Sequence, residues 1–289
     1  MPYILLASAT VFLSFSGIGA TFYNRKNSSC KDTAPIYNLI TLAVVFICWL
    51  IKFLTNPVYD LGVIPYSLLF TLGYTSAMIA SVSVYREGPM MLSSLIMQLS
   101  MISTSIWGFF FWNSPVTLPV ISGLVLVVVA LVLCLYNGKS ADSEKKISTK
   151  WLLLIAVYFI GNSLGSITQR TQQMNYESAY GDFLMVIATA ISLLVCILRY
   201  LKSDRSDTKK ILRSSGYVPV LCGLLNFIIN LVVIILATQL SASVVYPVMM
   251  IGALAITGIF SIFIFKEKMR PWQWLGVAVG ALAIALLSI

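Results

Sequence analysis

Basic residues in this chain are sorted among the gaps of a series of apolar stretches. Of its nineteen Lys and Arg residues, all but Lys52 and Arg170 fall in every second gap. A chain that threads repeatedly through a bilayer keeps its basic loops on the cytoplasmic side. The sorting therefore predicts a multi-pass membrane protein and also the way round that it sits.

Composition agrees with a membrane class. The 289 residues are 59% hydrophobic and only 10% charged, with a mean hydropathy of +0.92, whereas soluble domains carry about 25% charged residues. The net charge of +9 is explained by short basic loops beside anionic inner-leaflet lipid. We therefore expect the lipid bilayer, and no nucleic acid, as a partner.

The residue inventory limits the chemistry. The chain has no histidine, which excludes histidine bases and histidine metal ligands, and its five cysteines show no CxxC pairing. Four of the cysteines lie inside apolar stretches, as small buried hydrophobes do. We predict no cofactor, no metal site and no catalytic residue. Residues 2–22 lack a basic leader and are interpreted as a first span, not a signal peptide.

Ten stretches are long enough to cross a bilayer, which takes about 20 apolar residues. Backbone groups in lipid must be satisfied within the segment, so the fold class is all-α transmembrane. The predicted spans are 2–22, 35–54, 62–84, 88–112, 117–136, 151–170, 180–201, 217–237, 240–265 and 271–288.

The odd-numbered gaps hold the basic residues and are predicted to be cytoplasmic. With an even number of spans, both termini are then extracytoplasmic, in the plasma membrane of a bacterial cell. The acidic residues Asp60, Glu177 and Asp182 lie in the opposite loops. The basic residues of the odd gaps are Arg25, Lys26, Lys31, Arg86, Lys139, Lys145, Lys146, Lys150, Arg199, Lys202, Arg205, Lys209, Lys210, Arg213, Lys266, Lys268 and Arg270.

The polar stretch 137–150 divides the spans into two sets of five. Because five is odd, two related halves lie in opposite senses across the membrane, as in many transporters. Residues 88–136 align with residues 241–289 without a gap, and each segment consists of a span, a tight turn and a second span. We predict a first repeat at 1–136, a cytoplasmic linker at 137–150 and a second repeat at 151–289.

Two segments of the second half resemble the drug/metabolite transporter superfamily, EamA type. They are the LSASVVYP run at 240–247 and the FKEKMRPWQWLG run at 265–276, and a degraded copy of the motif, YREGPMMLSS, lies at 85–94. The resemblance implies ten helices in two inverted five-helix repeats around a central cavity. Spans 1, 3, 4, 6, 8 and 9 would line the cavity, and spans 5 and 10 would support it from outside. Members move small polar or amphipathic metabolites, often outward.

Polar residues in the middle of spans are costly and normally face a cavity or a partner helix. The amides of Asn226 and Asn230 are four residues apart and so share one helical face. They can donate and accept hydrogen bonds, which suits a polar ligand; the alternative is bonding between helices. The predicted substrate-binding residues are Ser16, Tyr74, Gln98, Asn162, Asn226, Asn230 and Tyr246.

The Tyr246-Pro247 pair is predicted to interrupt the ninth span. Proline has no backbone N–H, so Pro247 frees the carbonyl of Ser243. A broken helix can offer such groups to a ligand. The alternative, which we favour, is a kink that neighbouring Ser or Thr side chains satisfy.

No Asp or Glu lies in the middle of a span, which disfavours exchange of protons for a cationic drug. Glu87, beside Arg86, and Glu267, in a basic turn, are expected to form local ion pairs. Gly161 and Gly165 form a small-residue face. We expect it to pack within the chain; a homodimer contact is the alternative, so monomer and homodimer both stay open.

The leading function is a secondary transporter that moves a small polar or amphipathic organic metabolite by alternating access, in export or exchange. The chain is thus not expected to be an enzyme. One alternative is a membrane-embedded transferase acting on a lipid carrier, with the loop carboxylates of Asp142 and Glu144, or of Asp204 and Asp207. A membrane subunit that does not itself transport is the other.

Overall fold

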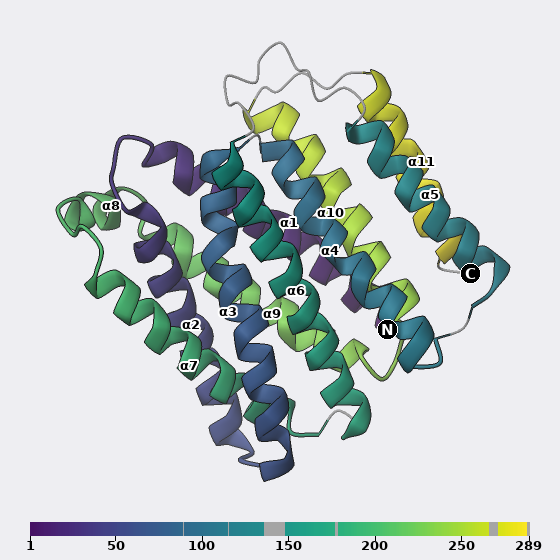
Figure 1. Ribbon diagram of the computed structural model, residues 1–289, viewed down its shortest axis with the longest axis horizontal. Helices are drawn as coiled ribbons and strands as arrows, with labels where there is room; N and C mark the ends of the chain where they lie inside the picture. The colour runs from purple at the N-terminus through teal and green to yellow at the C-terminus, as the bar shows by residue number, and fades with distance from the viewer. Residues whose placement is uncertain (89, 115, 136–147, 177–178, 266–270, 288–289) are drawn as a thin grey trace.

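The computed structural model describes residues 1–88, 90–114, 116–135, 148–176, 179–265 and 271–287. These residues form an all-helical bundle of eleven α-helices and one 3-10 turn, without a strand (Figure 1). The predicted all-α class is therefore confirmed. The linker residues 137–147, with Asp142 and Glu144, lie outside the described part, as do Glu177, Glu267, Lys266, Lys268 and Arg270.

Each predicted span coincides with one helix. Helices α1 and α6 run beyond the predicted ends, because polar ends that lie outside lipid can still continue a helix. The helices are α1 (Pro2–Lys26), α2 (Thr33–Thr55), α3 (Ile64–Glu87), α4 (Met90–Phe111), α5 (Leu118–Leu135), α6 (Thr149–Asn175), α7 (Gly181–Leu201), α8 (Thr208–Ser215), α9 (Tyr217–Leu236), α10 (Ala242–Phe265) and α11 (Pro271–Leu287).

Seven helices of the described chain are long and apolar enough to cross a membrane: α1, α2, α3 with its preceding turn, α6, α7, α9 and α10. The turn is the 3-10 segment η1 (Leu61–Val63). In α4 and α5 the apolar runs are shorter, Leu99–Phe111 and Leu118–Ala130. The chain is thus compatible with a multi-pass integral membrane protein.

Helices α3 and α6 cross closely because glycines lie at their contact. A Cβ atom on Gly161 would lie 2.8 Å from the carbonyl oxygen of Gly73, and one on Gly73 would lie 2.6 Å from the backbone nitrogen of Gly165. Only hydrogen atoms fit in that space. The small-residue face of Gly161 and Gly165 therefore packs within the chain, as expected.

The other main packing pairs are α1 with α9 and α10, α2 with α7 and α9, α4 with α6 and α10, and α3 with α7. Helices α5 and α11 pack on each other at one side of the bundle (Figure 1).

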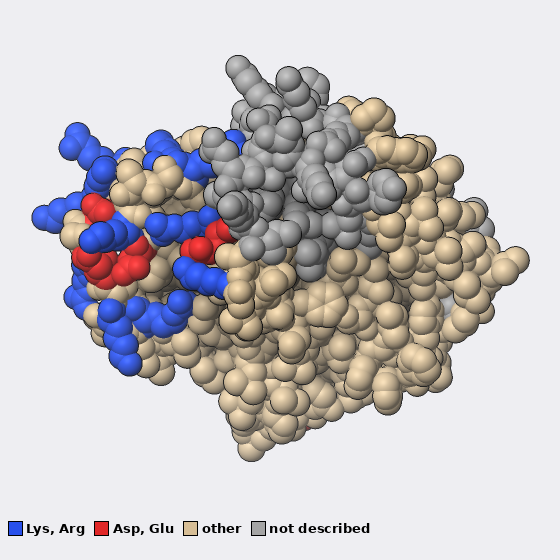
Figure 2. Space-filling model, turned by 45° about the horizontal axis from the view of Figure 1, so that its top comes forward, with Lys and Arg blue, Asp and Glu red and all other residues tan. Residues whose placement is uncertain are grey.

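Alternate gaps meet at the same end of the bundle. The backbone N–H of Lys31 donates to Asp207 over 3.0 Å, which joins the first gap to the seventh. The side chain of Lys150 bonds Glu87 over 2.7 Å, which joins the fifth gap to the third. We call this the basic end, and its Lys and Arg side chains gather on one face in Figure 2. At the opposite end, Lys52 forms an ion pair with Asp182.

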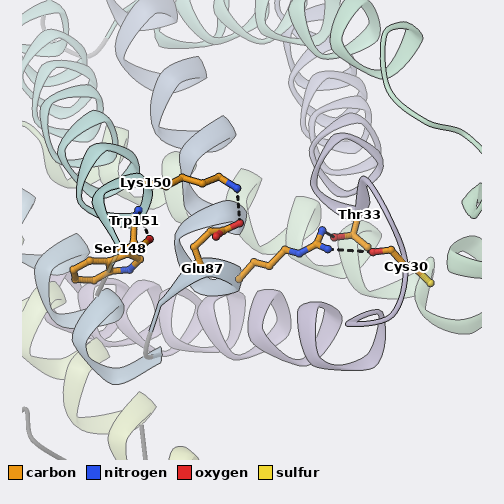
Figure 3. Close-up of polar contacts among 7 residues, drawn as sticks. Cys30, Thr33, Glu87, Ser148, Lys150 and Trp151 are labelled. Atoms are coloured by element: carbon orange, nitrogen blue, oxygen red, sulfur yellow. Dashed lines mark hydrogen bonds and ion pairs between the residues drawn. The ribbon is translucent and has the colours of Figure 1, made fainter. Parts of the chain in front are cut away.

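Glu87 was expected to form a local ion pair beside Arg86, but its ion pair is with Lys150 at the start of α6 (Figure 3). Arg86 instead donates to the hydroxyl of Thr33 over 3.1 Å and to the carbonyl of Cys30 over 3.2 Å. Side chains of adjacent helical residues point about 100° apart, so neighbours in sequence rarely face each other. These contacts tie the end of α3 to α6 and to the turn before α2.

Two further features differ from what the sequence suggested. Helix α10 continues through Pro247, so the expected interruption is absent; a proline removes one hydrogen bond, and the turns on both sides hold the helix. Helix α8 was not predicted, because eight residues rich in Lys and Ser are too short to stand out as a span. Its Ile211 is fully buried, while Lys209 and Lys210 are exposed.

Candidate functional site

A cavity of about 190 Å³ lies in the interior of the helical bundle. It is smaller than the ~300–1,000 Å³ of sites for drug-sized ligands, so only a small molecule could occupy it. Helices α1, α2, α3, α4, α6, α9 and α10 line it, and described residues of α5, α7 and α11 do not. The resemblance implied six of these helices, whereas Tyr37 and Thr41 of α2 were not expected there.

The predicted site residues come together in this cavity. Although they are far apart in the sequence, six of the seven line its wall: Ser16, Tyr74, Asn162, Asn226, Asn230 and Tyr246. The side chain of the seventh, Gln98, lies outside the described part of the chain. Their convergence is a fact of geometry; binding of a substrate by them stays a prediction.

A ladder of hydrogen bonds runs across the cavity wall from α3 to α9 and α6. The hydroxyl of Tyr74 donates to Oδ1 of Asn226 over 2.7 Å, and Nδ2 of Asn230 donates to the same oxygen over 3.1 Å. Nε2 of Gln169 donates to Oδ1 of Asn230 over 3.4 Å. The amides are therefore held in fixed orientations.

The ladder leaves hydrogen-bonding capacity unused. Nδ2 of Asn226 and Oε1 of Gln169 have no hydrogen-bond partner in the described part of the chain. One is a donor and the other an acceptor, and both belong to residues that line the cavity. A ligand with paired donor and acceptor groups could use them at little cost, since the side chains are already ordered.

A second polar contact joins α6 to α4. Nδ2 of Asn162 donates to the hydroxyl of Ser100 over 2.7 Å, and the hydroxyl of Ser163 donates to the carbonyl of Ser100 over 3.1 Å. Asn162 thus serves helix packing through its nitrogen, the role considered as an alternative for these residues. Its Oδ1 has no partner among the described residues and remains an acceptor beside the cavity.

Aromatic side chains supply much of the remaining wall. Phe70 and Tyr74 stack with their ring centroids 5.2 Å apart, and the rings of Tyr85 and Tyr158 also face the cavity. The hydroxyl of Tyr246 is buried, and Arg170 lies beside its ring. Flat rings together with amides favour a ligand that has both an apolar face and a polar edge.

The cavity wall carries no charged side chain among the described residues. A ligand with a net charge would lose its hydration on entering the cavity and would find no counter-ion in the wall, and such desolvation costs free energy at low dielectric. The geometry therefore suits an uncharged polar solute, or one whose charges cancel within the molecule. In the same part of the chain, no three His, Cys, Asp or Glu side chains cluster as a metal site would require.

Sequence reasoning missed several lining residues. Gln169 lies seven residues after Asn162, two helical turns along the same face, so its position was a usable signal. Tyr37 and Tyr85 gave none, because tyrosines near span ends are equally typical of the membrane interface.

Comparisons with known proteins support the fold only. No family model and no curated protein matches this chain. The chain is similar to solved structures, one of which carries only the description "Crystal structure of protein"; it aligns with a TM-score of 0.66 at 12% identity over 96% of both chains. At that identity the two proteins share an overall helical architecture, and nothing follows for the activity.

Proposed function

We propose that this protein is a secondary transporter that carries a small, uncharged or zwitterionic organic metabolite across the plasma membrane, in export or exchange. One observation carries the proposal: polar residues from both halves of the chain converge on one cavity whose described wall holds no charged side chain. An interior that only held helices together would be expected to fill with packed side chains. A cavity that carries several polar side chains inside a set of apolar helices favours a solute pathway.

We propose further that the bundle is a ten-span inverted repeat. Exchanging α1 with α6, α2 with α7, α3 with α9, α4 with α10 and α5 with α11 converts the packing pair α3–α6 into α1–α9. It likewise converts α1–α10 into α4–α6, and α2–α9 into α3–α7, and all of these helices pack. The pairs α2–α7, α4–α10 and α5–α11 map onto themselves. This correspondence supports two related halves that rock about the cavity, in a protein of the drug/metabolite transporter superfamily.

The basic end is proposed to be cytoplasmic, which would put both termini outside. On that assignment Lys150 and Glu87 join α6 to α3 at the cytoplasmic end, while Lys52 and Asp182 join α2 to α7 at the outer end. Alternating access requires such contacts to break in turn.

The transferase alternative has less support. Oδ1 of Asp204 accepts the backbone N–H of Ser206 over 3.0 Å, which lowers the pKa of that carboxyl below its usual range. Asp207 accepts the backbone N–H of Lys31. Both carboxylates thus hold the loop between α7 and α8, whereas a catalytic pair would face a substrate pocket.

The test is a comparison of metabolite release. Liposomes that contain the purified protein are loaded with a defined mixture of neutral, zwitterionic, cationic and anionic metabolites, and the retained solutes are measured by mass spectrometry. We expect selective loss of one or a few neutral or zwitterionic solutes, relative to liposomes without protein. Equal retention of every solute would contradict transport, and loss of cations alone would contradict the substrate class.

A further inference from the structure

Arg170 is the second basic residue that departs from the charge sorting, and its surroundings differ from those of Lys52. It lies in α6, five residues before the helix ends at Asn175, or about 7.5 Å at 1.5 Å per residue. Only 4% of its surface is exposed. Lys52, by contrast, is partly exposed and has Asp182 as its counter-ion.

The contacts of Arg170 hold its guanidinium without neutralising it. Nη2 donates to the carbonyl of Leu240 over 2.7 Å. The Cζ atom lies 5.4 Å from the ring centroid of Trp112 and 6.0 Å from that of Tyr246. No carboxylate lies within ion-pairing distance in the described part of the chain, and the buried Nε has no hydrogen-bond partner.

A buried charge without a counter-ion is costly, even when aromatic faces and one carbonyl offset part of that cost. If Arg170 served only to fasten α6 to the loop between α9 and α10, an uncharged donor such as glutamine could make the same bond to Leu240. The guanidinium instead keeps further N–H groups in one plane, and that arrangement matches a carboxylate.

A hollow of about 510 Å³ lies beside this guanidinium, at the end of the bundle opposite the basic end. Its wall comes from the loop that follows α4, from α6, and from the loop that joins α9 to α10. We call it the outer pocket. Neutral polar side chains face it together with Arg170, namely Asn113, Ser114, Gln239 and Ser241, and no acidic residue does so among the described residues.

We propose that the outer pocket binds a small organic carboxylate, with Arg170 as the group that receives its charge. The surrounding hydroxyls and amides can donate to carboxylate oxygens, and the rings of Trp112 and Tyr246 fix the guanidinium. Tyr246 lines the central cavity as well, so the bound anion lies one side chain away from it. This site is separate from the cavity with the uncharged wall, and its occupancy does not depend on transport.

The test is binding to the full-length protein in lipid nanodiscs. Sodium chloride is replaced stepwise by sodium acetate at constant sodium concentration, and thermal stability is followed. Acetamide, which has the shape of acetate without its charge, is titrated in parallel. We expect saturable stabilisation by acetate and none by acetamide. Equal stability in chloride and acetate, or an equal effect of acetamide, would overturn the proposal.

Variants locate the site. Arg170→Gln is expected to weaken acetate binding at least tenfold, while Lys52→Gln, the other basic residue at the same end, leaves it unchanged. Arg170→Lys keeps the charge but loses the planar arrangement, so it should bind acetate several-fold more weakly and covers the case in which the glutamine variant does not fold. Unchanged acetate affinity in Arg170→Lys would overturn the role of the guanidinium.

Discussion

The hydroxyl of Tyr74, in α3, donates a 2.7 Å hydrogen bond to Oδ1 of Asn226, in α9. The two residues are 152 positions apart in the sequence and belong to the two predicted halves. Their contact lies in the cavity wall, and it occupies the Oδ1 of the Asn226 amide while the amide nitrogen has no partner among the described residues. The polar site is therefore built jointly by both halves of the chain.

Tyr74→Phe tests that contact. The ring stays stacked on Phe70 while Asn226 loses one donor, so we expect a stability loss of about 1 kcal/mol. Substrate flux should fall several-fold because the amide is no longer fixed. The matched control is Tyr66→Phe, which removes the acceptor of a 2.9 Å bond from Asn175, and neither of these residues lines the cavity. Comparable loss of flux in both variants would contradict a special role for Tyr74.

The crossing of α3 and α6 is tested by two glycine substitutions. In Gly161→Ala the added methyl meets the carbonyl of Gly73 at 2.8 Å, so the helices must separate. We expect a destabilisation of about 1–3 kcal/mol, measured as a lower melting temperature in detergent. Gly165→Ala is the control, because its methyl finds its nearest neighbour at 3.5 Å. Equal melting temperatures for the two variants would contradict a close crossing of α3 and α6 at Gly161.

Much of the fold could be predicted because its causes are local. Apolar runs of the right length have to form helices in lipid, and the charge sorting assigned alternate loops to two ends. The cavity residues were found by the same reasoning: Ser16, Asn162 and Asn226 are polar in the middle of apolar spans, where polarity is costly. This rule, which needs only the sequence, therefore found most of the cavity residues that the structure describes.

Features that depend on how helices meet could not be predicted. The ion pair of Glu87 with Lys150 joins positions 63 residues apart, and only the packing of α3 on α6 brings them together. Arg170 looked like a residue at the end of a span, whereas the extension of α6 to Asn175 makes it a buried cation. The 3-10 turn η1 and helix α8 are each too short to be recognised by a search for apolar stretches of span length.

The orientation of the chain is tested by cysteine labelling. In a variant whose native cysteines are replaced by alanine, a single cysteine is introduced at Tyr59, 67% exposed at the end opposite the basic one, or at the exposed Lys209 of α8. A thiol reagent that does not cross membranes should label Tyr59→Cys in intact cells, and Lys209→Cys only after the cells are opened. The reverse pattern would invert the topology.

The ion pair at the basic end is tested by charge reversal. Lys150→Glu faces Glu87 with a like charge, so we expect altered flux and a stability loss of at most about 1 kcal/mol, since the Lys150 side chain is largely solvent-exposed and Glu87 partly so. The double variant Lys150→Glu with Glu87→Lys restores opposite charges and should recover both properties. If the double variant behaves like the sum of its single variants, the two residues are not coupled.

The most direct test of transport through this cavity is counterflow in proteoliposomes. Vesicles loaded with an unlabelled solute from the release screen are placed in the same solute carrying a label, and label uptake is followed over time. We predict rapid uptake with the native protein, loss of uptake with Asn226→Ala and Asn230→Ala combined, and normal uptake with Asn175→Ala, an amide removed outside the cavity. Uptake by the doubly substituted, correctly folded protein at the native rate would contradict the account.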